Sequence, residues 1–291
     1  MSNSPRILGI VNVTEDSFSD GGLYVTAGAA LAHARALAAG GADIIDLGAA
    51  ASNPRASPIP ADVEIERLVP VVDALKRDGV RLSIDSFATA TQHWALSCEV
   101  EYLNDIHGFG RPELYPRLAA TRAQLIVMHA LRNDRPASRD DKTPANLFER
   151  VLAFFVARIA AIVQAGIARQ RLILDPGMGL FLGNSPDASF DLLRRICDLK
   201  QAFGLPVLVS VSRKSFLRPA GRKPAEAGAA TLAAELFAAA QGVDYIRTHD
   251  PSALRDALGV TARLNTPDHR QSMKDFSAMM APFPNLGGQP A

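Results

Sequence analysis

Cysteine is scarce in this sequence, with only Cys98 and Cys197 among 291 residues. The two lack the spacing of a metal-binding pair, and each lies among residues typical of a helix. A scaffold held together by disulfides is therefore excluded, and we expect two buried free thiols in a reducing compartment.

A net charge of one sign and a long apolar run are also missing. The 31 Lys and Arg residues nearly balance the 30 Asp and Glu residues, for a formal charge of +1. No overall field would hold nucleic acid or an anionic membrane, so any anion must be bound locally. No apolar run approaches the roughly 18 residues of a membrane span, and the first residues lack the order of a signal peptide. We expect a cytoplasmic protein without nucleic-acid or membrane partners.

What the sequence contains is an alternation of short apolar runs and helix-like segments. The runs, each typical of a strand buried on both faces, are 6–13, 42–47, 81–85, 102–106, 124–129, 171–175, 206–211 and 243–249. Helical spacing covers 27–39, 64–77, a segment through Trp94 and Leu96, 112–121, 145–165, a segment through 192–200, 225–240 and 252–263. This alternation predicts an α/β fold, a single (β/α)8 TIM barrel over residues 1–265 with the active site at the C-terminal ends of the strands.

A doubly wound sheet is the alternative fold. Against it, no predicted strand leads into a Gly-x-Gly-x-x-Gly loop of the dinucleotide type. Residues 266–291, rich in Pro, Gly and Met, are interpreted as a poorly ordered tail, with a packed extension as the alternative.

Polar side chains recur where the predicted strands end. They are Asn12, Asp46, Asp85, Asn104, His129, Asp175, Lys214, Arg247 and His249. The C-terminal strand ends of a barrel form the face that carries its chemistry. A single Asp or Asn there commonly starts a turn or caps a helix, and Asp46 is interpreted in that way. The whole set predicts a binding site, because polar groups left unpaired at a barrel rim are costly.

The set sorts by chemistry. Three members offer a carboxylate or an amide: Asp85, Asn104 and Asp175. Such groups suit a flat, nitrogen-rich heterocycle. Arg247 and His249 alternate along one predicted strand, so they face the same side, and they suit a phosphate. Asn12 could add an oxygen ligand for Mg²⁺, which prefers few protein ligands together with substrate phosphates. The residues alone predict a barrel enzyme that acts on a phosphorylated or pyrophosphorylated heterocycle.

Seven motifs, in order along the chain, narrow the prediction to one family of enzymes. They occupy 9–22, 83–86, 103–106, 127–129, 174–179, 212–216 and 247–249. The most distinctive are Gly9-Ile-Val-Asn-Val-Thr-Glu-Asp-Ser-Phe-Ser-Asp-Gly-Gly22 and Ser212-Arg-Lys-Ser-Phe216. With these motifs the sequence resembles the dihydropteroate synthases from Ile7 to about Leu258.

The resemblance implies a homodimeric barrel enzyme of folate biosynthesis. It would join 6-hydroxymethyl-7,8-dihydropterin diphosphate to p-aminobenzoate and release pyrophosphate. The implied pterin-binding residues are Asp85, Asn104, Met128, Asp175 and Lys214, of which Asp85, Asp175 and Lys214 would be catalytic. The implied diphosphate-binding residues are Asn12, Arg247 and His249, with Asn12 also a ligand of Mg²⁺. The implied p-aminobenzoate-binding residues are Ser52, Pro54, Phe181, Arg213 and Ser215, the last at the start of the helix after Lys214.

Two loops depart from the family pattern. Where most members have Ser-Thr-Arg-Pro, this chain reads Ala51-Ser-Asn-Pro54, so Asn53 lacks a guanidinium that Arg55 could replace. The common Phe-Gly-Lys after the sixth strand becomes Leu180-Phe-Leu-Gly183. These departures are similar to the sulfonamide-resistant branch, and they predict that Phe181 excludes sulfonamides while p-aminobenzoate still binds.

Three alternatives stay open. The chain could be a drug-sensitive housekeeping synthase, a non-catalytic pterin-binding homologue, or a pterin-dependent methyltransferase on a related barrel. His107 and His129 lie close to the predicted site in sequence, and structural roles are expected for both.

Overall fold

The computed structural model describes residues 4–13, 27–50, 59–132, 137–138, 140–218 and 222–265. Within them lie the strands β1 (Arg6–Asn12), β2 (Ile44–Gly48), β3 (Leu82–Asp85), β4 (Tyr102–Asp105), β5 (Gln124–Met128), β6 (Leu172–Asp175), β7 (Leu208–Val209) and β8 (Tyr245–Thr248). They pair in parallel in the order β6-β5-β4-β3-β2-β1-β8-β7.

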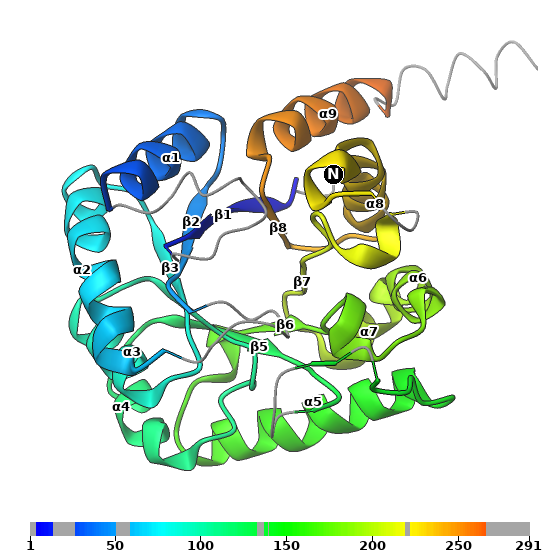
Figure 1. Cartoon of the computed structure of the whole chain (residues 1–291). Helices are drawn as coiled ribbons and strands as arrows, with labels where there is room; N and C mark the ends of the chain where they lie inside the picture. The colour runs from blue at the N-terminus through cyan, green and yellow to red at the C-terminus, as the bar shows by residue number, and fades with distance from the viewer. Residues whose placement is uncertain are drawn as a thin grey trace, which may run out of the picture.

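The sheet closes on itself at the end of this order. Leu174 of β6 forms a bridge to Val207, and its amide donates to the carbonyl of Pro206 at 2.8 Å. Closure excludes the doubly wound alternative and confirms the predicted (β/α)8 barrel, whose strands Figure 1 shows ringed by helices.

The surrounding helices are α1 (Ala27–Ala39), α2 (Ala61–Arg77), α3 (Thr89–Ser97), α4 (Tyr115–Ala119), α5 (Leu147–Gln164), α6 (Pro186–Arg194), α7 (Ile196–Phe203), α8 (Gly228–Ala240) and α9 (Pro251–Leu264). Short 3₁₀ turns are η1 (Pro112–Leu114), η2 (Arg169–Arg171), η3 (Gly179–Leu182), η4 (Ser215–Leu217) and η5 (Pro224–Ala227). None of the helices in the described ranges is long and apolar enough to cross a membrane.

Two predicted helices differ from the structure. The helix expected through 192–200 is broken at Arg195, whose backbone leaves the helical region (φ −103°, ψ 13°) between α6 and α7. The helix expected over 112–121 is a 3₁₀ turn followed by the short α4, which has Pro116 in its first turn. The predicted tail, 266–291, lies outside the described residues.

The apolar core has two layers because both faces of each strand are covered. The larger layer lies between the strands and the helices and includes Val11, Leu47 and Ile84. The smaller layer fills the inside of the barrel and consists of Leu8, Ile44, Tyr102, Ile126, Ile173, Leu208 and Tyr245. Successive strand residues point to opposite faces, so these seven define the inward register of their strands.

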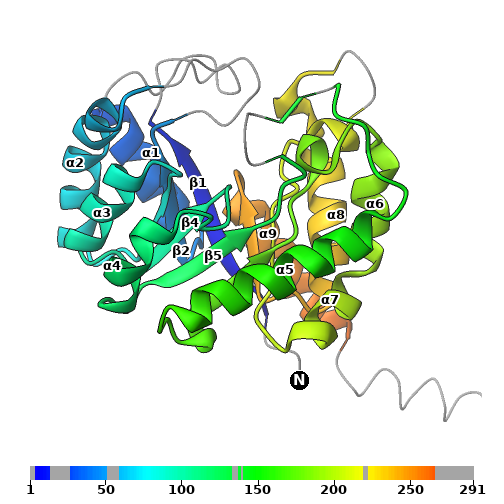
Figure 2. The same cartoon turned by 90° about the horizontal axis from the view of Figure 1, so that it is seen from below.

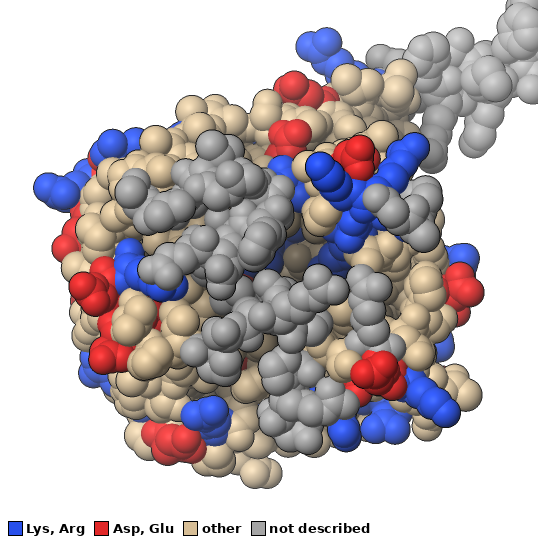
Figure 3. Space-filling view, viewed as in Figure 1, with Lys and Arg blue, Asp and Glu red and all other residues tan. Residues whose placement is uncertain are grey.

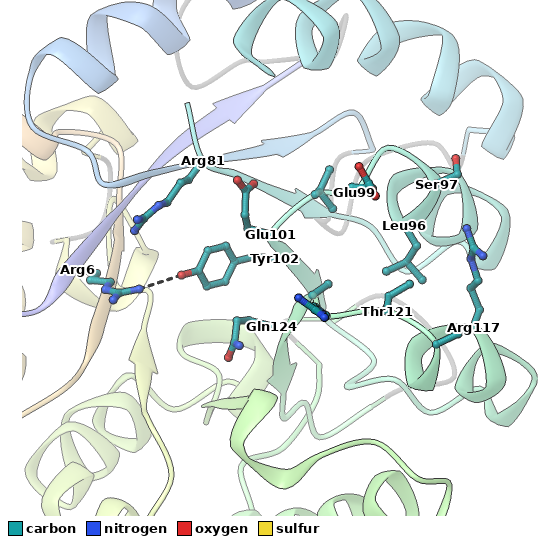
Figure 4. Close-up of a pocket in the computed structure, with 14 residues that line it drawn as sticks. Arg6, Arg81, Leu96, Ser97, Glu99, Glu101, Tyr102, Arg117, Thr121 and Gln124 are labelled. Carbon is teal, nitrogen blue, oxygen red and sulfur yellow. Dashed lines mark hydrogen bonds between the residues drawn. The ribbon is translucent and has the colours of Figure 1, made fainter. Parts of the chain in front are cut away.

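The N-terminal end of the barrel is closed below this inner layer. Nη1 of Arg6 donates to the hydroxyl of Tyr102 at 3.1 Å (Figure 4). The rings of Tyr102 and Tyr245 pack edge to face with centroids 6.2 Å apart. A cavity of about 840 Å³ at this end is lined by side chains of both signs, among them Arg81 and Glu101. In Figure 2 the N-terminus lies at this end, and β1 runs away from it toward the opposite rim.

Candidate active site

A polar layer lies directly above the inner apolar layer. The residues two positions further along the same strands also point inward, and they are Ile10, Asp46, Asn104, Met128, Asp175, Ser210 and Arg247. On β3 the register pairs Asp85 with Asn104, which places Asp85 in the same layer. Apart from Ile10 and Met128, the inward positions thus change from apolar to polar over one step, at the C-terminal ends of the strands. Figure 3 looks onto this rim, where the surface is hollowed and basic side chains gather at the hollow.

Arg247 joins three strands within this layer. Its Nε donates to Oδ2 of Asp46 at 2.5 Å, and its Nη2 donates to Oδ2 of Asp85 at 2.7 Å. Burial alone would lower the pKa of Arg247, but the carboxylates of Asp46 and Asp85 outweigh it and raise that pKa. Burial raises the pKa of Asp85 to about 7; Arg247 opposes this shift, and Asp46 adds to it. Arg247 therefore stays charged and holds two acidic groups together.

Several buried oxygens in this layer or directly below it have no hydrogen-bond partner. Among the described residues, Oδ1 of Asp46, Oδ1 of Asn104 and the hydroxyl of Ser83 are buried without a hydrogen-bond partner. The amide nitrogen of Asn104 approaches Oδ2 of Asp46 at 3.5 Å. Buried polar atoms are normally paired, so an exception calls for a physical explanation. Acceptors of this kind suit a ligand that carries N–H groups.

Lys214 and Asp175 lie on the other side of the rim. Nζ of Lys214 donates to the carbonyl of Met178 at 3.1 Å, and Oδ1 of Asp175 accepts from the amide of Gly177 at 2.8 Å. Burial lowers the pKa of Lys214 to about 8, although Asp175 opposes the shift. Burial also raises the pKa of Asp175, against the hydrogen bond from Gly177 and the charge of Lys214.

The loop after Asp175 requires glycine. Gly177 has φ +73°, and a Cβ there would lie 2.4 Å from the carbonyl oxygen of His129. The backbone can approach β5 this closely only without a side chain. The loop then turns into η3, where the ring of Phe181 lies 4.9 Å from Nζ of Lys214.

His249 lies one residue beyond β8 and is neutral. Its Nδ1 is 2.9 Å from the hydroxyl of Ser212, which also accepts from the backbone amide of His249 at 3.2 Å. Burial lowers the pKa of His249 to about 3, and the charges of Arg213 and Arg247 add to the shift. The role of Ser212 was not predicted from the sequence, although this residue begins the Ser-Arg-Lys-Ser motif.

The remaining predicted site residues occupy the same end of the barrel. Asn12 ends β1 and Met128 ends β5, where it pairs in register with Asp175. Arg213 adopts φ +60°, and its amide donates to the hydroxyl of Thr231 at 3.1 Å. Ser215 is exposed at the start of η4. Ser52 and Pro54 lie outside the described residues.

Three expectations from the sequence are wrong. Asp46 is neither a turn residue nor a cap, because it lies inside β2, is fully buried and pairs with Arg247. The helix expected after Lys214 is the three-residue η4, which is too short to offer the dipole of a long helix. Cys98 and Cys197 are free thiols, as expected, but both are half-buried rather than buried.

The contacts of the two nearby histidines favour the structural roles expected for them. The Nδ1 of His129 is 3.1 Å from the carbonyl oxygen of Pro176, and burial lowers the pKa of His129 to about 4. The amide of His107 donates to Oδ1 of Asp105 at 2.8 Å, and its ring packs on Phe87.

The side chains of the site also bear on whether the protein alone could hold a metal ion. The described ranges contain no cluster of three or more His, Cys, Asp or Glu side chains suited to holding one. Such a set does not fit a metal held by the protein alone. It is compatible with Mg²⁺ held by a single side-chain oxygen together with oxygens of a bound ligand.

A closed parallel barrel with paired acids and bases at its C-terminal rim defines a TIM-barrel enzyme. The model of a family described as pterin binding enzyme matches residues 8–249. A dihydropteroate synthase type-2 from Escherichia coli is 56% identical over 265 residues, which cover 91% of this chain and 97% of that protein. The chain therefore belongs to the pterin-binding enzymes and, within them, to the dihydropteroate synthases.

Solved structures of dihydropteroate synthases have the same fold as this chain. The dihydropteroate synthase of Xanthomonas albilineans with 4-aminobenzoic acid superposes with a TM-score of 0.82 at 34% identity, covering 91% of this chain and 95% of that one. The Yersinia pestis enzyme in complex with a sulfonamide drug superposes with a TM-score of 0.83 at 32% identity, covering 90% and 94%.

Proposed function

We propose that the polar layer at the barrel rim carries out the dihydropteroate synthase reaction. In this reaction 6-hydroxymethyl-7,8-dihydropterin diphosphate and p-aminobenzoate form 7,8-dihydropteroate and pyrophosphate. The observation that carries the proposal is the set of buried acceptor oxygens on Asp46 and Asn104, beside Asp85 and Asp175, which match a ring rich in N–H groups.

The pterin ring would bind within this layer. Asp85, Asn104 and Asp175 would contact its ring nitrogens and exocyclic groups, and Met128 would pack against its face. Lys214, whose pKa of about 8 leaves it charged at neutral pH, would donate to a ring acceptor. Burial excludes water and strengthens each of these hydrogen bonds.

The diphosphate would bind at the mouth of the layer. Its oxygens would be held by Asn12, Arg247 and the neutral His249. Two carboxylates already contact Arg247, but its guanidinium has further N–H groups that can donate to a phosphate. The family implies Mg²⁺, and Asn12 would be its protein ligand; when bound, the ion offsets charge on the leaving pyrophosphate.

Bond breaking would precede bond making. The bond from the methylene carbon to the diphosphate oxygen breaks, and its electron pair leaves with pyrophosphate. Asp85 and Asp175 would stabilise the cationic pterin methylene that remains. The amine of p-aminobenzoate then forms the new C–N bond and loses a proton.

p-Aminobenzoate would bind between η3 and η4, with Ser52 and Pro54 as further contacts predicted from the sequence. Phe181, Arg213 and Ser215 would line this part of the site. The ring of Phe181 next to Lys214 supports this position. The homodimer stays a prediction from the resemblance.

An assay of pyrophosphate release tests the proposed function. We expect release only when both substrates are present, together with 7,8-dihydropteroate as the product. A non-catalytic homologue would bind pterin and release nothing, and a methyltransferase would not consume p-aminobenzoate.

Sulfonamide insensitivity is the finer part of the proposal. Phe181 would exclude sulfonamides, which are bulkier than p-aminobenzoate, at a steric cost of about 2–4 kcal/mol. We expect Phe181→Gly to lower the inhibition constant of sulfamethoxazole at least about tenfold, with a smaller change in the KM for p-aminobenzoate. Tight inhibition of the unaltered enzyme would contradict this part and leave the synthase reaction untouched.

A further inference from the structure

The hydroxyl group of Thr143 links the turn that carries Phe181 to the loop before α5. Thr143 lies in the segment before α5, 38 positions before Phe181 in sequence. Its Oγ1 donates to the carbonyl of Leu182 at 3.0 Å and accepts from the amide of Ser185 at 3.0 Å. The hydroxyl therefore fixes the backbone on both sides of Gly183.

Gly183 allows this close contact. It has φ +101°, and a Cβ there would lie 2.5 Å from Oγ1 and 2.7 Å from Cα of Thr143. Any side chain at this position would push the two loops apart, in addition to the backbone strain. The close approach therefore requires glycine at position 183, and it brings the Thr143 hydroxyl within reach of the backbone beyond it.

The turn is also held at its other end. The amide of Gly179 donates to the hydroxyl of Ser189 on α6 at 2.8 Å, and the amide of Leu131 donates to the carbonyl of Phe181 at 3.0 Å. Leu182 is fully buried, whereas Phe181 is half-buried with its ring beside Lys214. The backbone is thus fixed around a ring that points to the site.

We infer that Thr143 is a positioning residue that determines substrate specificity by holding the Phe181 ring against the p-aminobenzoate part of the site. An obstructing side chain discriminates between ligands only if it cannot move aside, so the obstruction needs a rigid backbone. The inference rests on the proposed role of Phe181. It assigns the rigidity to a residue that itself contacts no substrate.

Three variants of the full-length enzyme test this inference. Thr143→Val keeps the shape of the side chain but removes the hydroxyl, and Thr143→Ser retains the hydroxyl. Thr261→Val is the matched control, because it removes a hydroxyl that donates to the carbonyl of Ala257 at 2.8 Å on α9. The readouts are kcat, the KM for p-aminobenzoate, the inhibition constant of sulfamethoxazole, and hydrogen exchange of the Ser185 amide.

For Thr143→Val we expect faster exchange of the Ser185 amide and an inhibition constant lower by about three- to tenfold, the effect of one or two lost hydrogen bonds. We expect kcat within about twofold of the unaltered enzyme, since the polar layer is unchanged. Thr143→Ser and Thr261→Val should behave like the unaltered enzyme. Faster exchange with an unchanged inhibition constant, or unchanged exchange, overturns the inference.

A double variant separates this inference from the proposal on which it rests. In the Phe181→Gly background, Thr143→Val should have no further effect on inhibition, because the ring to be positioned is gone. If Phe181→Gly alone leaves inhibition unchanged, the proposed obstruction fails. If Phe181→Gly restores inhibition and Thr143→Val does not weaken the discrimination, only the role of Thr143 fails.

Discussion

Arg247 and its two carboxylate partners are the most constrained group of the candidate site. Asp46 and Asp85 lie 201 and 162 positions from Arg247 in sequence, yet both contact its guanidinium. Burying three charges is tolerated only when each is paired. The group therefore couples the geometry of β2, β3 and β8, on which substrate binding would depend.

Removing Asp46 tests this coupling. We expect Asp46→Ala to lower kcat/KM by about ten- to hundredfold, because Arg247 loses one of its two carboxylate partners and turns toward the other. The control is Asp78→Ala, which breaks the exposed pair with Arg35 and should change kcat/KM by less than about twofold. Pyrophosphate release measures both. Equal effects of the two variants would remove Asp46 from the site.

The protonation states of Asp85 and Lys214 predict a pH profile. The pKa of Asp85 is about 7 and that of Lys214 is about 8. Binding as proposed needs an ionised Asp85 and a charged Lys214, so kcat/KM for the pterin diphosphate should rise through pH 7 and fall through pH 8. A profile measured from pH 6 to pH 9 that is flat would contradict these roles.

At the residue scale, the sequence predicted which side chains belong to the site better than it predicted which side chains they contact. Asp85, Asn104 and Asp175 stood out because each lies at or near the end of an apolar run. Asp46 lies within such a run, but its ion pair with Arg247 depends on a contact across most of the chain. Only the inward register of β2, two residues beyond Ile44, could have pointed to it.

At the scale of elements, α8 carries a buried acid behind β8. Glu235 is 1% exposed and accepts a hydrogen bond from Thr248. Burial raises its pKa from 4.5 to about 8. The folded state then binds more protons than the unfolded state between these values. The contribution of Glu235 to the free energy of unfolding is therefore fully present below about pH 4.5 and is lost as pH rises toward 8.

Glu235→Gln should remove this pH dependence. We expect the Tm of the variant to equal that of the unaltered protein near pH 4.5 and to exceed it at pH 8.5, because the amide keeps the hydrogen bond without the charge. Thermal unfolding at both pH values measures the difference. The control is the exposed Glu113→Gln, and an identical shift in both variants would contradict the assignment.

Strands were easier to predict than helix breaks. A strand buried on both faces has a plain apolar signal, and the structure places each strand inside its predicted range to within one residue. The break between α6 and α7 has no such signal, because helical spacing continues through Arg195. That residue instead packs over the ring of Phe148, 3.5 Å from its centroid, which is a tertiary contact.

At the scale of the whole molecule, the barrel separates support from chemistry. The inner apolar layer and the contacts of Arg6 and Tyr102 close one end. The polar layer occupies the other end, at the C-terminal ends of the strands. This division explains why a barrel tolerates several buried acids at its rim. The apolar layers supply the stability, so the rim residues can serve substrate binding instead.

The most direct test compares Lys214→Ala with His129→Ala in the two-substrate assay. Lys214 lies at the rim beside the polar layer, whereas His129 is neutral and contacts the carbonyl of Pro176. We predict that 7,8-dihydropteroate and pyrophosphate form with the unaltered enzyme, that Lys214→Ala abolishes turnover, and that His129→Ala has a milder effect. An unchanged rate in Lys214→Ala would contradict the account.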